Sequence, residues 1–245
     1  MKIINVFNMK RIVFSFLSMV ILWLSGCMKP IDDIQYYEYI PAFVEIDFSY
    51  GIKLNTPIGS IVSGELQKNT DLWDGDAILA FFTVNYDQQE STEYIVAYDI
   101  GYVIVETGIA VGITEEDSNF DDNDFPIENM GVFPPLFENI LFLGFGHKAP
   151  GDQKFNYLMT FDRDVKSGTQ VLKIRAKKMG EGKENEKNFL YPYAFNLRSF
   201  FNNSDEKNPL RFSIQYKTGV DKDGNDEFKT YIDNNGDSIF KLVIE

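Results

Sequence analysis

Short runs in which apolar and polar side chains alternate recur along most of this chain. The stretches Phe155–Phe161 and Leu210–Tyr216 are clear examples, and no stretch shows the spacing of a long amphipathic helix. A period of two places every second side chain on the same face of a β-strand. The 22 Phe, 13 Tyr and 2 Trp residues supply enough apolar bulk for folded cores. The sequence therefore predicts an all-β protein.

Five strand-like runs lie in the segment 43–114. In the first run every second side chain from Val44 to Tyr50 is apolar, which predicts a strand with these side chains on its buried face. Turn residues such as Asp74-Gly75 separate the runs. We therefore expect residues 43–114 to form a small β-barrel domain.

An acidic segment without basic residues, 115–134, follows the barrel segment and predicts an inter-domain linker. Seven further strand-like runs lie within 135–245, and Ser199–Asn203 is expected to form one helical turn. Seven short alternating strands over about 107 residues are typical of an immunoglobulin-like β-sandwich. The second predicted domain is therefore a sandwich over residues 135–245.

The N-terminus has the pattern of a secretion signal. Three basic residues precede the apolar run Ile12–Leu24, which is shorter than the ~20 residues that a bilayer-spanning helix requires. The run ends in Leu24-Ser25-Gly26-Cys27, which looks like a bacterial lipobox. Residues 1–26 are thus predicted to be a lipoprotein signal peptide, with Cys27 as the lipidation site.

A lipid on Cys27 would attach the protein permanently to a membrane, and residues 27–42 would form a tether between lipid and barrel. Alternatively, Tyr36, Tyr37 and Tyr39 dock on the barrel and shorten this tether. Met28 stands where an Asp would indicate retention at the inner membrane in some Gram-negative bacteria. We therefore expect an outer-membrane location, and the sequence leaves open whether the protein faces the periplasm or the cell surface.

Several short motifs follow one another in an order that is known from one family. They are Leu72–Leu79 with Asn85-Tyr86, Asn139–Leu143, Ala194–Leu197 and Leu210–Ile214. Together with the lipobox, this layout resembles the NigD-like lipoproteins of the Bacteroidetes over nearly the full chain. The resemblance implies an N-terminal OB-like barrel and a C-terminal β-sandwich, and it brings no catalytic residue.

Charge argues against a nucleic-acid partner, although OB folds often bind single strands through basic grooves. The segment Phe43–Gly108 carries eleven acidic and two basic residues, a net charge of −9. Binding phosphates requires the opposite sign. The chain has one histidine, His147, which we expect to be a solvated turn residue, and it has no Gly-x-Ser-x-Gly motif. No enzymatic activity is therefore expected.

Two groups of residues are candidate binding sites. The acidic turn that contains Asp221, Asp223, Asn225 and Asp226 offers alternate oxygen ligands for calcium, although Asp-Gly turns are also ordinary hairpin turns. In the strand-like run that starts at Thr169, three basic residues occupy one face: Lys173, Arg175 and Lys177. This cationic row either protects an edge strand from pairing or docks an acidic partner.

The predicted function is that of a non-enzymatic cell-envelope lipoprotein that acts as a binding or assembly module for a protein partner. Two alternatives remain open at this point. One is a glycan-binding or glycan-processing accessory lipoprotein, and the other is an adhesin that is stabilised by calcium.

Overall fold

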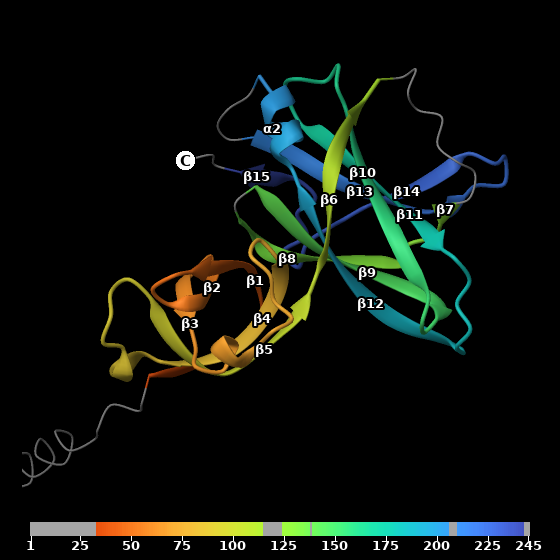
Figure 1. Ribbon diagram of the computed structural model, residues 1–245. Helices are drawn as coiled ribbons and strands as arrows, with labels where there is room; N and C mark the ends of the chain where they lie inside the picture. Colours follow the sequence, from red (N-terminus) through yellow and green to blue (C-terminus); the bar gives the residue numbers. More distant parts are fainter. Residues whose placement is uncertain (1–32, 115–123, 138, 206–209, 243–245) are drawn as a thin grey trace, which may run out of the picture.

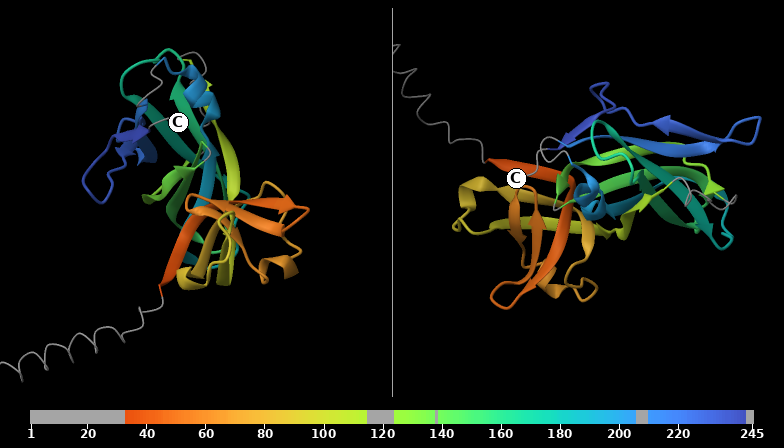
Figure 2. Two further views of the ribbon diagram at one scale, coloured as in Figure 1. Left: turned by 90° about the vertical axis from the view of Figure 1, so that its left-hand side faces the viewer. Right: turned by 90° about the horizontal axis from the view of Figure 1, so that it is seen from above.

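The computed structural model describes residues 33–114, 124–137, 139–205 and 210–242. The regular structure of the described residues is nearly all β and forms a closed five-stranded barrel and a large curled sheet (Figures 1 and 2). The strands of the barrel are β1 (Ile34–Asp47), β2 (Gly51–Thr56), β3 (Gly59–Val62), β4 (Ala77–Asn85) and β5 (Ile95–Ile104), with short 3₁₀ turns η1 (Leu66–Lys68) and η2 (Tyr86–Gln88).

The large sheet contains all later strands and packs one short helix, α2 (Arg198–Asn203), beside β6. Its strands are β6 (Glu106–Ile113), β7 (Asp124–Phe125), β8 (Asn129–Phe137), β9 (Ile140–Pro150), β10 (Lys154–Asp162), β11 (Gln170–Met179), β12 (Glu186–Asn196), β13 (Leu210–Val220), β14 (Asp226–Thr230) and β15 (Phe240–Leu242).

The barrel has the strand order β1-β2-β3-β5-β4 and closes between β4 and β1. This order, with β3 parallel to β5, is that of an OB-like barrel, so the expected barrel is confirmed. A bulge lets β1 bend around the barrel and pair with β4 first and β2 afterwards. Tyr39 lies at this bulge with a left-handed backbone, φ 54°.

The barrel begins earlier in the sequence than we expected. The predicted tether, 27–42, overlaps β1, whose residues Ile34–Ala42 pair with β4. The prediction was wrong here because Tyr36, Tyr37 and Tyr39 interrupt simple alternation, and because β1 needs its bulge to follow the barrel wall. Fewer residues therefore separate Cys27 from the first strand than we expected.

The large sheet has the order β14-β13-β11-β10-β6-β12-β9-β8, with β15 and β7 on its margins. It curls so that side chains from β9 and β12 pack against side chains from β10, β11 and β13 in one core. This arrangement is a β-sandwich, as predicted, and every one of the seven strand-like runs of residues 135–245 corresponds to an observed strand. The expected helical turn is also present as α2.

The sandwich includes strands that the predicted boundaries had placed elsewhere. Residues 106–113, counted with the barrel in the range 43–114, form β6 in the middle of the sandwich. The range 115–134, expected to be a linker, contains β7 and most of β8. Charge misled the prediction because Asp124 is buried and ion-paired while Ile127 and Met130 fill the core.

Strand β6 joins the two halves of the sandwich. Its first part, Glu106–Ile109, pairs with β12, and its second part, Ala110–Ile113, pairs with β10. Both pairings are parallel, and Figure 1 shows β6 running from the barrel up through the sandwich to α2. A single residue, Val105, separates β6 from β5 of the barrel, and it is buried.

A small core seals the contact between barrel and sandwich. Side chains from β4 of the barrel pack against β9 and β12, with Phe142 at 0% exposure in the centre. The ring of Phe43 stacks on Phe137 at 5.7 Å and lies 5.8 Å from Phe142.

Within the described ranges, no helix is long and apolar enough to cross a membrane.

Replacing Phe142 with Ala should destabilise the whole protein. The substitution opens a cavity between barrel and sandwich, which typically costs about 3–5 kcal/mol. Urea denaturation followed by circular dichroism measures this loss. Ile109→Ala, at a side chain with 64% exposure in the same protein, is the control and should change the stability by less than about 0.5 kcal/mol. A loss below about 1 kcal/mol for Phe142→Ala would contradict the buried interface.

Candidate protein-binding surface

The end of β1 and the turn that follows it expose apolar side chains that the sequence pattern had predicted to be buried. Val44 is buried as expected, but Ile46 and Tyr50 are exposed and Phe48 is fully exposed. Strand β1 ends at Asp47, whose Oδ1 accepts the backbone N–H groups of Ser49 and Tyr50 at 2.6 and 3.2 Å. The alternation of apolar and polar residues therefore continues past the strand into a turn, where it no longer indicates which side chains face the barrel interior.

A second turn lies beside this one and exposes Trp73, with 71% of its surface accessible. The Asp76 carboxylate accepts the backbone N–H of Trp73 at 2.7 Å, and the Asp74 carboxylate accepts the N–H of Ile46 at 2.9 Å. The second bond fixes the Trp73 turn against the end of β1. We call Ile46, Phe48, Tyr50 and Trp73 the apolar rim.

The rim continues into a shallow groove. Tyr50 packs against Tyr94 with ring centroids 5.1 Å apart, and its hydroxyl donates to the Glu93 carboxylate at 3.1 Å. A cavity of about 210 Å³ lies between these rings and the end of β3. Its walls are formed by Tyr50, Val62, Ser63, Gly64, Gln67, Tyr94 and Val96.

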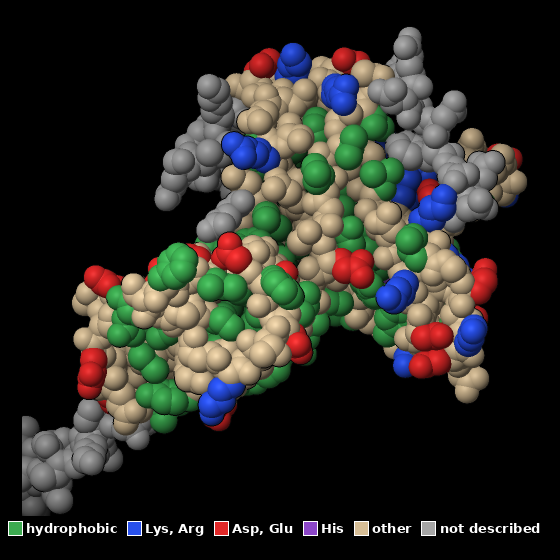
Figure 3. Space-filling model, viewed as in Figure 1, with side chains coloured by type: hydrophobic (Ala, Val, Ile, Leu, Met, Phe, Trp, Pro, Cys, Tyr) green, Lys and Arg blue, Asp and Glu red, His purple; other side chains and the backbone are tan. Residues whose placement is uncertain are grey.

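Carboxylates surround the apolar rim and give it a negative field. Four of them, Asp47, Asp74, Asp76 and Glu93, accept hydrogen bonds from the rim or its turns. The bond from the Ser49 backbone is the main reason why the pKa of Asp47 is lowered. Figure 3 shows acidic and hydrophobic side chains interspersed on the visible face of the barrel, with few basic ones.

The position of the rim matches the place where OB folds bind their ligands. In OB folds the loop between strands 1 and 2 and the loop between strands 4 and 5 flank the binding face. Phe48 and Tyr50 lie in the first of these loops, and Tyr94 lies in the second. This is a similarity of fold and carries no ligand identity by itself.

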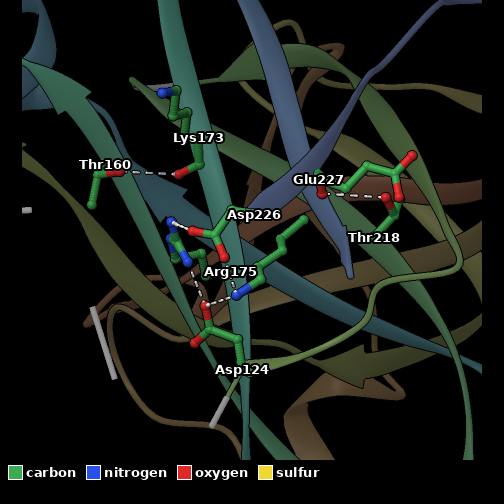
Figure 4. Close-up of polar contacts among 8 residues, drawn as sticks. Asp124, Thr160, Lys173, Arg175, Thr218, Asp226 and Glu227 are labelled. Carbon is green, nitrogen blue, oxygen red and sulfur yellow. Dashed lines mark hydrogen bonds and ion pairs between the residues drawn. The ribbon is translucent and has the colours of Figure 1, made fainter. Parts of the chain in front are cut away.

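The cationic row that we expected on β11 is broken in the structure. Lys173 and Lys177 are exposed, but Arg175 is buried and pairs with Asp124 at 2.6 Å and with Asp226 (Figure 4). Strand β11 also lies between β10 and β13, so the edge-strand explanation was wrong. The row is therefore not one continuous binding face.

Arg175 belongs to a group of four charged side chains that crosses four strands and is buried except for Asp226, whose side chain is 34% exposed. Lys217 completes it, with its Nζ 3.1 Å from Asp124 and 2.6 Å from Asp226. Two cations and two carboxylates balance, which compensates for the cost of desolvating each charge. This ion-pair cluster ties β7 and β14 to β11 and β13, and its role is structural.

The predicted calcium ligands make two separate sets of contacts, one within the turn before β14 and one in the ion-pair cluster. Asp221 Oδ1 accepts the backbone N–H groups of Asp223 and Asn225 at 2.8 and 2.9 Å, which closes the turn before β14. These bonds lower the pKa of Asp221, and the bond from Asn225 contributes most. Asp226 points instead into the ion-pair cluster. No cluster of three or more His, Cys, Asp or Glu suited to a metal occurs among the described residues.

His147 is not the solvated turn residue that we expected. It lies in β9 at 1% exposure, with its ring stacked on Phe155 at 4.1 Å. Nδ1 lies 3.0 Å from the carbonyl oxygen of Pro126, so it carries the proton and donates. Nε2 therefore accepts from the Tyr157 hydroxyl at 2.7 Å. Both ring nitrogens therefore form hydrogen bonds within the core.

Cys27, the predicted lipidation site, lies outside the described residues.

Comparison with known proteins was informative only at the level of structure. No family model matches the chain, and no curated protein matches it in sequence. An uncharacterized protein from Parabacteroides merdae has a TM-score of 0.64 and 17% identity, over 84% of this chain and 98% of that one.

Two further solved structures share the fold. A protein of unknown function (DUF1344) from Bacteroides vulgatus has a TM-score of 0.56 and 15% identity, over 84% of this chain and 96% of that one. A NigD-like immunity protein from Bacteroides caccae has a TM-score of 0.51 and 16% identity, over 86% and 100%. The neighbours thus include a NigD-like protein, at an identity that establishes the fold alone.

The buried histidine should make stability depend on pH. Burial lowers the pKa of His147 from 6.5 to about 4, against the opposing effect of the bond to Pro126. The unfolded chain binds this proton more tightly, so stability is complete above pH 6.5 and falls as the pH decreases towards 4. The total loss from this group is roughly 3 kcal/mol.

Urea midpoints measured between pH 7.5 and 4 test this expectation, with His147→Gln as the matched variant. The variant should be less stable at neutral pH but should lose less stability on acidification than the wild type. Parallel pH profiles for the two proteins would contradict the assignment.

Proposed function

We propose that this chain is a NigD-like, lipid-anchored protein of the outer membrane that binds a protein partner through the apolar rim. The observation that carries the proposal is a set of exposed apolar side chains, including a fully exposed Phe48, held in fixed turns. Exposed apolar patches with polar surroundings commonly mark interaction sites.

The rim has the features of a binding hot spot. Large aromatic side chains dominate such sites because they bury much area and lose little conformational freedom. Here the backbone of both turns is fixed by the carboxylates of Asp47, Asp74 and Asp76. The binding site is therefore organised before the partner arrives, which lowers the entropic cost of association.

Charge defines the chemistry of the partner. The rim is surrounded by carboxylates on a barrel segment with a net charge of −9. A matching partner would present an apolar pocket with Lys or Arg around it, and electrostatic attraction would accelerate association. The same negative charge supports the expectation that the barrel does not bind nucleic acid.

Two observations support a non-enzymatic role. His147, the single histidine of the chain, has both ring nitrogens engaged in the core. One neighbour in the structural comparison is described as a NigD-like immunity protein. We extend this role to the present chain only as a general one, the binding of another protein.

A glycan ligand is the second candidate, favoured by the groove between Tyr50 and Tyr94. Aromatic rings can stack on sugar faces, and Glu93 accepts a hydrogen bond beside them. The groove is small and the rim extends beyond it to Trp73, which favours the protein partner. If a soluble glycan displaced a bound partner protein from Tyr50 and Tyr94, the glycan would become the preferred ligand.

Capture from detergent-solubilised envelope extracts tests the rim. The full chain with an affinity tag is the bait, beside the double variant Phe48→Ser, Trp73→Ser. Val220→Ser, at a side chain with 58% exposure on the sandwich, is the matched control. A protein retained by wild type and control should be reduced at least about tenfold with the rim variant, since hot-spot truncations cost about 2 kcal/mol or more.

Equal capture by the rim variant and the control would argue against the rim as the binding site. Mass spectrometry of the retained proteins identifies the partner, and its surface should carry basic residues around an apolar pocket.

Metabolic labelling with palmitate tests the anchor separately. The label should appear on the wild-type protein and disappear in Cys27→Ala, and that variant should leave the membrane fraction because each buried methylene contributes ~0.8 kcal/mol to membrane binding. Lys10→Ala keeps the lipobox and serves as the control. An unlabelled wild-type protein would remove the anchor from the proposal and leave the rim untouched.

A further inference from the structure

One wall of the barrel exposes large apolar side chains beside the point where the chain enters the fold. The wall consists of β1, β4 and β5, with β4 between the other two strands. Tyr36 of β1 is 60% exposed, and Tyr98 of β5 is 43% exposed. Both residues pair with Thr83 of β4, so the three side chains form one row across the wall.

The neighbouring residues show that this row lies on the outer surface. Tyr37 points the other way, because its ring packs against Phe82 at 5.2 Å in the barrel core and its hydroxyl lies 2.7 Å from that of Tyr86. Successive side chains of a strand alternate between its two faces, so Tyr36 faces outward. Ile34, the first residue of β1, lies on the same outer face and is also exposed.

A glycine makes the apolar surface of this wall continuous. Gly101 of β5 has no side chain, and the half-buried ring of Phe81 occupies the space where a Cβ would otherwise lie. The ring therefore covers β5 between Tyr98 and Val103, which is itself 41% exposed. We call the following residues the tyrosine face: Ile34, Tyr36, Phe81, Tyr98 and Val103.

The tyrosine face lies next to the proposed lipid. Ile34 belongs to the face and follows Cys27 by only seven residues, which extend over at most roughly 25 Å. With a lipid on Cys27, this end of β1 stays within that distance of the bilayer. An exposed apolar face that is held so close to a membrane can bury its surface in the interfacial region.

The side chains of the wall define the lipid chemistry. Tyrosine suits the membrane interface because its ring is apolar and its hydroxyl remains in contact with water. Strands β1, β4 and β5 contain no Lys or Arg, and the exposed Glu38 and Asp99 lie in the bulges of β1 and β5. Anionic lipids attract basic side chains and repel carboxylates. The face therefore suits headgroups without net charge.

We propose that the tyrosine face docks on the bilayer surface, among zwitterionic lipid headgroups, and so fixes the orientation of the barrel on the membrane. The aromatic and aliphatic side chains enter the interfacial region, and the tyrosine hydroxyls bond to headgroups and water. The inference rests on the lipid anchor of the proposed function, because the anchor brings the face to the membrane. It does not depend on the partner of the apolar rim.

Fluorescence quenching in vesicles tests the inference. Once Cys27 carries its lipid, a cysteine introduced by Thr83→Cys is the only free thiol of the mature chain and can carry a fluorescent probe between the two tyrosines. The lipidated chain is reconstituted into vesicles of phosphatidylcholine and phosphatidylethanolamine that contain spin-labelled lipid. The lipid should quench the probe, at a depth of about 5–10 Å in the interfacial region.

Two matched variants control this measurement. Val220→Cys places the same probe at a side chain with 58% exposure, at the β13–β14 hairpin, which Figure 1 shows on the side of the molecule away from the start of β1. That probe should not be quenched. Adding Tyr36→Ser and Tyr98→Ser to the Thr83→Cys chain should reduce quenching to the level of the Val220→Cys control. Both tyrosines are exposed, so this variant should keep its melting temperature.

Palmitate labelling of the same sample separates this inference from the anchor. A labelled protein whose Thr83→Cys probe is quenched no more than the control probe would overturn the inference and leave the anchor in place. Quenching that persists without the two tyrosines would also overturn it. An unlabelled protein would remove the anchor and the inference together. Adding phosphatidylglycerol should weaken the quenching, and an increase would contradict the preference for zwitterionic headgroups.

Discussion

The parallel pairing of β6 with two partners is the interaction on which the rest of this structure depends. This strand follows directly on the last strand of the barrel, lies in the middle of the sandwich and joins the two halves of its sheet. With Val105 as the only residue between β5 and β6, the barrel cannot turn freely relative to the sandwich. The aromatic contacts around Phe142 then fix the remaining degrees of freedom. The molecule has two folding units but one rigid frame.

Buried polar side chains of the sandwich and exposed apolar side chains of the barrel have different roles in this structure. The ion-pair cluster around Arg175 and the buried His147 lie within the sandwich and stabilise it. The apolar rim lies in turns of the barrel, where short carboxylate bonds fix the backbone and leave the aromatic side chains exposed. Residues that the sequence offered as candidate binding sites, such as Arg175 and Asp226, thus have structural roles. Apolar side chains that were expected in the core, such as Phe48, are exposed.

Much of the fold was predictable because alternation reports local geometry directly. Phe155, Tyr157, Met159 and Phe161 alternate in the sequence, and all four are buried in the sandwich core. What alternation does not carry is the choice of partner strand. The pairing of β6 with strands about fifty and about ninety residues away depends on contacts that no local pattern records.

The misplaced site residues have the same cause. Arg175 stands between two exposed lysines, and its buried partner Asp124 lies 51 residues upstream. Phe48 and Tyr50 continue the rhythm of β1 past its end at Asp47, so that only the turn chemistry of Asp47 to Gly51 could have revealed their exposure.

The early start of β1 has a consequence for the proposed lipid anchor. With the proposed lipid on Cys27, only the seven steps to Ile34 separate the bilayer from the first strand, a leash of at most roughly 25 Å. Phe48 and Tyr50 follow the other end of the same strand, whose 14 residues have a contour length of roughly 45 Å along the curved barrel wall. With such an anchor the barrel would lie close to the bilayer, and the apolar rim would meet partners within the reach of this short connection.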